Sequence, residues 1–337
     1  MLNMIESLAR TDLSRSSLTS LAEDMVAGRS THDEMVASLA SLSARGETSE
    51  QIRIFAEAFA AASVKVQTKH HAVADLCGTG GAQFRTFNVS TVSAFVVAGC
   101  GVPVAKHGNR SSNGVCGSAD LLTALGANPI IGPELAERML DDIGITFLFA
   151  PHYHPAMRNV AAVRKELRSK TVFNVIGPLL NPVEAEKMQL MGVYDPRLLD
   201  LVPGIMNEMG IKRALVVHGF PGMDEVSTLG TTQAVLLDHG RTERFEIEPR
   251  SLGFDAPRPE VVSELTPELS AKVARRILSG SPGPRREIVV LNSACALFAC
   301  NKVKNIGEGI DMASMSLDSG KAMQMLTEFV DMSRAEG

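Results

Sequence analysis

A chain of 337 residues is longer than one hydrophobic core usually serves, which favours two lobes or one large domain with a smaller one. Its formal net charge of −5 is spread without a run of Lys or Arg, which argues against a nucleic-acid-binding protein. No apolar run approaches the roughly 18 residues of a membrane span. The N-terminus lacks a secretory pattern, and the five cysteines lack metal-ligand spacing, so we expect a cytoplasmic protein with reduced thiols and no membrane partner.

Residues 1–66 predict a small lobe of three short amphipathic helices. Gly28 and Gly46 are typical helix stops, and two capping boxes, Thr31 with Glu34 and Thr48 with Gln51, predict helix starts.

Beyond this lobe, short apolar segments alternate with helical patterns, which predicts an α/β domain with a mainly parallel sheet. The expected strands are residues 73–77, 103–106, 146–149, 188–194 and 214–218. The expected helices between them are residues 91–98, 119–125, 133–142 and 197–209. A basic helix at 155–167 and an irregular stretch at 171–182 would return to the first lobe, so the expected domains are 1–66 with about 155–182, and 67–154 with 183–337. We expect the β-rich residues 234–248 to extend the sheet and three further helices to cover it, with no catalytic or binding residues in this part of the chain.

Gly78-Thr79-Gly80-Gly81 follows a predicted strand, and Asn88-Val89-Ser90-Thr91 opens the next helix. Glycines let backbone N–H groups approach phosphate oxygens, and a helix N-terminus adds unpaired donors, so this unit predicts an anion cradle. It matches neither the P-loop nor the dinucleotide pattern. A glycine-rich turn that merely joins strand to helix is the alternative.

A second candidate loop, Lys106-His107-Gly108-Asn109-Arg110, follows the next strand and leads to Ser118, the expected N-cap of a helix. Two βα loops of one parallel sheet open on the same edge, so they can share a ligand. Lys106 would bring positive charge to a phosphate, and Asn109 offers a donor and an acceptor. The alternative is a solvated turn.

Asp224 and Glu225 follow another strand end, where adjacent carboxylates suit Mg²⁺, although such a pair alone is usually a solvated turn. His152 and His154 have no third ligand at zinc spacing. Arg164, on the basic helix, has the planar fork that binds a carboxylate with two hydrogen bonds.

Taken together, these motifs resemble the anthranilate phosphoribosyltransferase family over nearly the whole chain. The motifs are Gly78-Thr79-Gly80-Gly81, Thr86-Phe87-Asn88-Val89-Ser90-Thr91, Lys106-His107-Gly108-Asn109-Arg110, Gly117-Ser118-Ala119-Asp120, His154-Pro155-Ala156-Met157, Gly177-Pro178-Leu179-Leu180-Asn181-Pro182 and Asp224-Glu225.

The resemblance implies a helical domain and an α/β domain with the active site between them, and a homodimer formed through the helical domains. It implies the Mg²⁺-dependent reaction of phosphoribosyl pyrophosphate with anthranilate in tryptophan biosynthesis. The residues implied to surround phosphoribosyl pyrophosphate are Gly78, Thr79, Gly80, Gly81, Ala82, Thr86, Asn88, Val89, Ser90, Thr91, Lys106, His107, Gly108, Asn109, Arg110, Ser111, Ser112, Asn113, Gly114 and Ser118. Those implied to contact anthranilate or to line its route are Gly78, Asn109, Arg164, His107, His154 and Pro178, and those implied for the metal are Ser90, Asp224 and Glu225.

No general base is expected, because the aromatic amine is already a competent nucleophile and alignment with electrostatic stabilisation can supply the acceleration.

The chain departs from the family pattern at two places. Ala82 and Gln83 stand where the family usually has Asp-Gly, so a carboxylate near the sugar or the metal is missing. Residues 113–116 replace a serine-rich run with a more apolar loop. Competing hypotheses are a pyrimidine-nucleoside phosphorylase, a non-catalytic relative that binds nucleic acid, and a catalytically impaired homologue.

Overall fold

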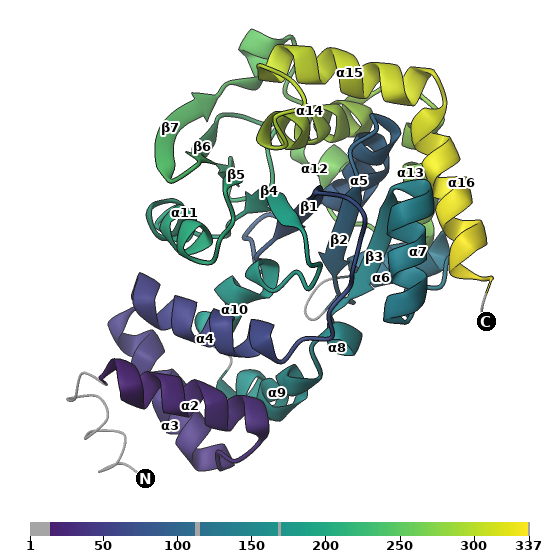
Figure 1. Ribbon diagram of the computed structural model, residues 1–337. Coiled ribbons are helices and arrows are strands. Elements are labelled where there is room, and N and C mark those ends of the chain that lie inside the picture. The colour runs from purple at the N-terminus through teal and green to yellow at the C-terminus, as the bar shows by residue number, and fades with distance from the viewer. Residues whose placement is uncertain (1–13, 112–114, 168–169, 336–337) are drawn as a thin grey trace. The chain divides into compact units, whose positions relative to one another are not determined.

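The computed structural model of the protein describes residues 14–111, 115–167 and 170–335 (Figure 1). Its contacts divide the chain into two compact units. The first comprises Met1–Lys65 and Pro151–Pro182, and the second comprises Val66–Ala150 and Val183–Gly337. Within the described ranges, no helix is both long and apolar enough to cross a membrane.

The first unit is helical, and its local signals act as the sequence predicts. Helix α2 (Arg15–Ala27) ends at Gly28 in a left-handed conformation, φ 69°. Helix α3 (His32–Arg45) and helix α4 (Ser49–Ala61) both begin with complete capping boxes. The returning segment adds α8 (Ala150–Tyr153), α9 (Arg158–Leu167), α10 (Val172–Ile176) and two 3₁₀ turns, Pro155–Met157 and Gly177–Leu179. Phe173 packs edge-on against Phe55 and Phe59, with ring centroids 6.0 and 5.2 Å away.

The second unit is built on a seven-stranded sheet of order β3-β2-β1-β4-β5-β6-β7. Strands β3 to β5 in this order run parallel, and β6 and β7 are antiparallel additions. The strands are β1 (Ala72–Gly78), β2 (Val104–Gly108), β3 (Ile145–Phe149), β4 (Glu186–Gly192), β5 (Arg213–Gly219), β6 (Thr232–Asp238) and β7 (Arg241–Ile247). The predicted α/β fold with a mainly parallel sheet is therefore confirmed.

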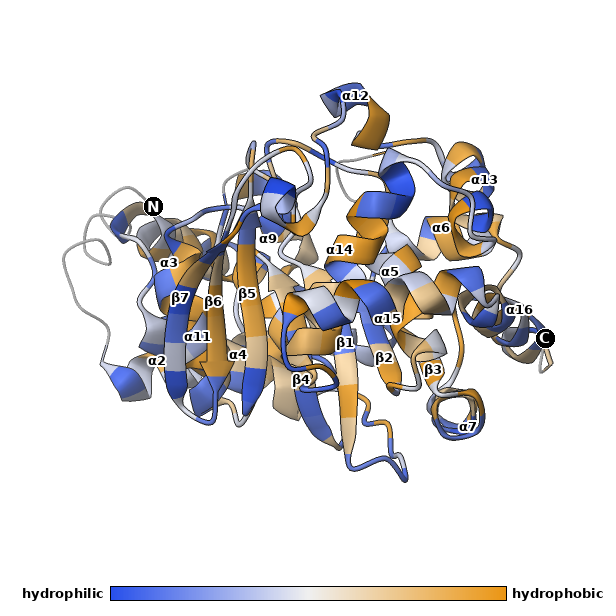
Figure 2. Ribbon diagram, turned by 90° about the horizontal axis from the view of Figure 1, so that it is seen from above, coloured by the Kyte–Doolittle hydropathy of each residue, from blue (hydrophilic) through white to orange (hydrophobic). Residues whose placement is uncertain are grey.

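Helices cover both faces of this sheet because the strand order reverses at β1. The connection from β1 to β2 runs one way and that from β4 to β5 the other, so right-handed crossovers place α5 (Val89–Gly99) and α11 (Leu198–Glu208) on opposite faces. Helix α14 (Pro284–Ala299) packs beside α5, on the side away from α11 (Figure 1). The remaining helices are α6 (Ser118–Ala124), α7 (Pro133–Ile143), α12 (Pro259–Val262), α13 (Pro267–Leu278), α15 (Ile306–Asp318) and α16 (Lys321–Ser333), with a 3₁₀ turn at Pro249–Leu252. In Figure 2 the central strands are mostly hydrophobic, whereas the edge strand β7 is mostly hydrophilic.

Three local predictions are wrong. Gly117, not Ser118, caps α6, because the carboxylate of Asp120 accepts the N–H of Gly117. The stretch 171–182 is not irregular, since a capping box of Thr171 and Asn174 starts α10 there. Five α-helices rather than three follow β7 in the described residues, because breaks at residues 263–266, 279–283, 300–305 and 319–320 divide this part of the chain.

Candidate active site

The candidate phosphate loops meet at the point where the strand order reverses. Strands β1 and β4 are parallel neighbours, and their helical connections leave towards opposite faces. In open α/β sheets, ligands bind at the carboxyl ends of the strands at such a point. The loop after β1 begins at Gly78, and β4 ends at its register partner Gly192. The Asp224-Glu225 pair follows β5 at the same edge.

The glycine loop is bonded to the first carboxylate. The backbone N–H of Gly80 donates to Oδ2 of Asp224 at 2.7 Å, and Gly80 and Gly81 have left-handed φ angles of 68° and 71°. Any side chain at Gly78 or Gly192 would collide with Asp224, since their Cβ atoms would lie 2.5 Å from its Oδ2 and 1.5 Å from its carbonyl oxygen. These glycines let Asp224 approach the phosphate loop.

The second carboxylate lies at the start of α5. The hydroxyl of Thr86 donates a short hydrogen bond to Oε2 of Glu225, whose carboxylate also accepts the backbone N–H of Ser90. Burial, reinforced by the charge of Asp224, raises the pKa of Glu225 to about 8 despite these donors. Glu225 therefore tends to keep a proton at neutral pH unless a cation replaces it.

Oxygen ligands suitable for Mg²⁺ gather here. Asp224, Glu225 and the hydroxyl of Ser90 are hard donors, and Mg²⁺ needs few protein ligands because it keeps waters and binds substrate phosphates. Within residues 14–111, 115–167 and 170–335, no group of three or more His, Cys, Asp and Glu is placed to hold a metal. The donor set fits an ion that arrives together with a phosphorylated substrate.

Lys106 is a buried cation beneath the loops. The residue is 3% exposed, and its Nζ donates to the carbonyl oxygen of Leu76 at 2.5 Å and to Oγ of Ser90 at 3.3 Å. Burial lowers its pKa, and the charge of Asp75 opposes this effect. Strand β2 extends to Gly108, two residues beyond the expected end at Lys106, so Lys106 lies within the strand rather than at the junction of strand and loop.

The loop after β2 is shaped by Asp120 of α6, which the sequence-based site omits. Its carboxylate accepts the N–H groups of Ser111 and Gly117, each at 3.0 Å, and pairs with Arg110 at 2.9 Å. Burial pulls the pKa of Asp120 upwards, but these donors outweigh it and lower the pKa. The predicted residues Ser112, Asn113 and Gly114 lie outside the described residues.

Several other predicted phosphate-site residues lie along this edge. Asn109 and Arg110 are exposed, and Ala82 is buried. Val89 and Thr91 are 0% and 1% exposed, so their side chains face the core of the unit and only the backbone of this turn lies at the edge. Gly192 was missed because a single glycine at the end of a strand has no distinctive local pattern.

In the helical unit, the Arg164 guanidinium lies over the ring of Phe173, 5.6 Å from its centroid. Burial lowers the pKa of this guanidinium, which nevertheless stays charged. His154 is 3% exposed, and burial together with the charge of Lys65 lowers its pKa to about 4. Pro178 is buried in the 3₁₀ turn Gly177–Leu179. In the other unit, His107 is 7% exposed, and its backbone N–H donates to Oδ1 of Asp75.

Comparisons with known proteins agree with this architecture. Residues 70–323 match the glycosyl transferase family, a/b domain. Anthranilate phosphoribosyltransferase of Desulfitobacterium hafniense is 46% identical over 315 residues, covering 94% of this chain and 93% of that protein. The enzyme of Desulfosudis oleivorans is 42% identical over 329 residues, 97% of each chain.

The chain belongs to the anthranilate phosphoribosyltransferase family.

Solved structures of the family superpose along almost the whole chain. Anthranilate phosphoribosyltransferase of Thermus thermophilus is 34% identical, with a TM-score of 0.91 over 98% of this chain and 99% of that one. The Saccharomyces cerevisiae enzyme, in complex with phosphoribosyl pyrophosphate and Mg, is 27% identical, with a TM-score of 0.89 over 98% of this chain and 97% of that one. Another structure of the yeast enzyme contains 4-fluoroanthranilate.

Proposed function

We propose that the protein transfers the phosphoribosyl group of phosphoribosyl pyrophosphate to the amine of anthranilate and releases pyrophosphate. The observation that carries the proposal is a pair of hydrogen-bonded carboxylates. Asp224 accepts a hydrogen bond from the glycine loop, and Glu225 accepts hydrogen bonds from Thr86 and from the first turn of α5. Two carboxylates would repel a phosphate at these positions unless a divalent cation lay between them. The arrangement therefore suits a substrate that binds as its magnesium complex.

In this mechanism Ser90, Asp224 and Glu225 would hold Mg²⁺, and the ion would supply positive charge to neutralise the pyrophosphate. The backbone of the glycine loop and the N-terminus of α5 orient the phosphates, and Lys106 adds fixed positive charge behind Ser90. The substrate amine forms a bond to the ribose carbon as the bond from that carbon to pyrophosphate breaks. No protein side chain is assigned as general base, so the proton that the amine loses passes to water or to the departing pyrophosphate. Alignment of the two substrates supplies much of the acceleration.

Arg164 is proposed to bind the carboxylate of anthranilate. The partial burial of its guanidinium strengthens a charge-assisted bond, and its contact with Phe173 limits its rotamers. We propose Gly78, Asn109, His107, His154 and Pro178 as further residues on the anthranilate side, following the family resemblance.

The two compact units are proposed to be the helical and the substrate-binding domains of the enzyme, and the protein is proposed to be a cytoplasmic homodimer. An open groove of about 740 Å³ between α2 and α4 supports the dimer. Its lining includes Arg15, Arg29, Glu23 and Glu57, charges of both signs that could pair between two copies related by a two-fold axis. The free cysteines among the described residues fit a reducing compartment. Sedimentation velocity would test the dimer, and a monomer at micromolar concentration would contradict it.

The activity is tested by the loss of anthranilate fluorescence in the presence of phosphoribosyl pyrophosphate and Mg²⁺. Arg164→Lys keeps the charge but loses the planar fork, so the KM for anthranilate should rise roughly tenfold or more while the KM for phosphoribosyl pyrophosphate stays unchanged. Lys165→Met, at the next residue of α9, whose side chain is exposed, is the matched control and should behave like the wild type. Folded protein that turns over neither substrate, but cleaves thymidine with phosphate, would replace the proposal with a nucleoside phosphorylase.

A further inference from the structure

A segment far along the chain is paired with the loop that carries Thr86. We call residues 261–264 the strap. The N–H of Phe87 donates to the carbonyl oxygen of Val262 at 3.2 Å, and the N–H of Glu264 donates to that of Arg85 at 3.0 Å. Thr86 and Ser263 form an antiparallel bridge between these bonds. The strap thus fixes the backbone on both sides of Thr86, whose hydroxyl donates to Glu225.

The same strap also reaches the loop that follows β2. Oε2 of Glu264 accepts the backbone N–H of Val115 at 3.3 Å. The next residue, Cys116, is held from the other side, since its carbonyl oxygen accepts Nδ2 of Asn88 at 3.0 Å. Glu264 therefore connects two loops of the candidate active site, one through its backbone and the other through its side chain.

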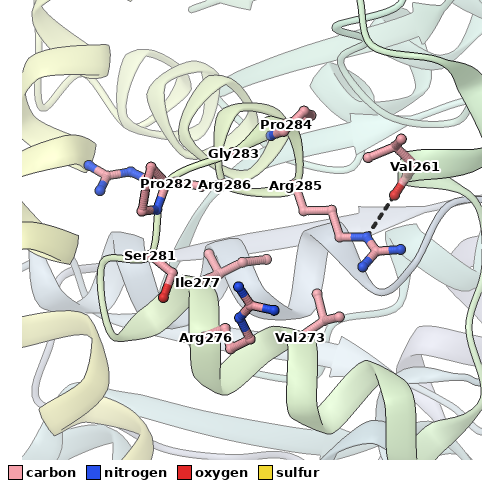
Figure 3. Close-up of a pocket in the computed structure, with 10 residues that line it drawn as sticks. All are labelled: Val261, Val273, Arg276, Ile277, Ser281, Pro282, Gly283, Pro284, Arg285 and Arg286. Atoms are coloured by element: carbon pink, nitrogen blue, oxygen red, sulfur yellow. Dashed lines mark hydrogen bonds between the residues drawn. The ribbon is translucent and has the colours of Figure 1, made fainter.

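The strap is in turn anchored to α14. Nε of Arg285 donates to the carbonyl oxygen of Val261 at 2.6 Å (Figure 3). Beside this contact lies an open pocket of about 180 Å³, bordered by Val261, Val273 and Ile277. Val262 is buried and gives the strap its apolar anchor. The buried side chain of Val262 and the guanidinium of Arg285 thus add to the backbone bonds that hold the strap.

We infer that Glu264 and Arg285 are positioning residues for the binding of phosphoribosyl pyrophosphate, an inference that rests on the function proposed above. The strap holds residues 85–87 of the loop after β1, and Val115, in place before the substrate arrives. Without the strap, only a fraction of the molecules would hold these residues in the conformation that binds the substrate. The apparent Kd would then rise, because it equals the intrinsic Kd divided by that fraction. The sequence alone predicts no functional residue in this third of the chain.

The inference is tested with Glu264→Ala, Glu264→Gln and Arg285→Met. A lost hydrogen bond of this kind corresponds to about a fivefold change in an equilibrium constant. In Glu264→Ala we expect the KM for phosphoribosyl pyrophosphate and its calorimetric Kd with Mg²⁺ to rise about fivefold, with kcat and the KM for anthranilate unchanged. Glu264→Gln keeps an acceptor oxygen and should recover part of the affinity. Glu260→Ala, an exposed acid on α12, is the matched control and should be neutral.

Hydrogen–deuterium exchange provides a readout that does not depend on turnover. Exchange should quicken around Val115 in Glu264→Ala, and around both Phe87 and Val115 in Arg285→Met. Unchanged exchange and unchanged KM in both variants would overturn the inference. A parallel loss of Tm, kcat and affinity for both substrates would also overturn it, because it would show a merely structural role. If the wild type does not use phosphoribosyl pyrophosphate, the proposed function fails, whereas the exchange data still decide whether the strap fixes the loops.

Discussion

Replacing Gly192 by Ala tests whether the close approach of the Asp224 main chain to the end of β4 is required for activity. A Cβ atom at Gly192 would lie 1.5 Å from the carbonyl oxygen of Asp224 and 2.1 Å from its carbonyl carbon. The φ angle of Gly192 is not in the left-handed region, so the alanine backbone itself is unstrained. The substitution therefore acts only through the steric clash between the added Cβ atom and the main chain of Asp224.

The size of the effect follows from these distances. Ordinary contact begins at 3.4 Å, so the two atoms must separate by 3.4 − 1.5 = 1.9 Å. The neighbour is main chain, which cannot turn aside as a flexible side chain would. Overpacking of this kind costs about 1–3 kcal/mol of stability. A misplacement of about 1 Å can reduce a rate about 100-fold, so a shift of Asp224 by nearly twice that distance should lower kcat/KM by at least about 100-fold.

The assay combines turnover with calorimetric titration of phosphoribosyl pyrophosphate and Mg²⁺. Gly204→Ala is the matched control, because Gly204 lies exposed in α11 with no atom within 4 Å of an added Cβ. The control should keep full activity and gain slightly in Tm, since alanine is the better helix former. If Gly192→Ala stays folded and keeps kcat/KM within threefold of the wild type, the close approach of Asp224 to Gly192 is not required for activity.

Three further predictions concern charge. Ala82→Asp restores the carboxylate that the family usually has there and should tighten binding of phosphoribosyl pyrophosphate with Mg²⁺, as measured by calorimetry. An unchanged Kd would mean that the missing carboxylate does not weaken the binding of this substrate. Because burial raises the pKa of Glu225 to about 8, metal binding must displace a proton, so the Tm gain on adding MgCl₂ together with phosphoribosyl pyrophosphate should grow from pH 6 to pH 8. Glu225→Gln should abolish this growth, and a Tm gain that does not depend on pH in the wild type would contradict the idea. His154 has a folded pKa of about 4 against 6.5 when unfolded, so the unfolded state binds more protons between these values and stability falls as the pH drops below 6.5. Urea unfolding of the wild type should lose about 2 kcal/mol more between pH 7.5 and pH 5 than that of His154→Gln, and equal losses would show that this histidine is not the source.

Local structure was predictable wherever a signal lies within a few residues of its effect. The capping boxes at Thr31 and Thr48 and the stop at Gly28 act through hydrogen bonds and dihedral angles inside one turn, so short-range chemistry suffices. Ser118 shows the limit of this approach. A serine is a good N-cap in general, but the carboxylate of Asp120 selects Gly117 instead.

The site was partly predictable for a related reason. Glycine loops and adjacent carboxylates at strand ends are local patterns, and a parallel sheet brings its carboxyl ends to one edge. Gly78 and Asp224 could therefore be assigned to one site before the strand order was known. The contribution of Lys106 was predicted only in part, because its charge was expected at the junction of strand and loop, whereas it is buried in β2.

By itself, the sequence determined the class of fold, the ends of many helices and strands, and the residue types that can hold a phosphate and a divalent cation. The tertiary structure alone decided that β4 lies beside β1, which presses Gly192 against Asp224, and that the strap pairs with the loop of Thr86. The physical reason is the range of the interactions. Caps and turns are decided by neighbours along the chain, whereas strand order and the pairing of distant loops depend on how the whole apolar surface is buried.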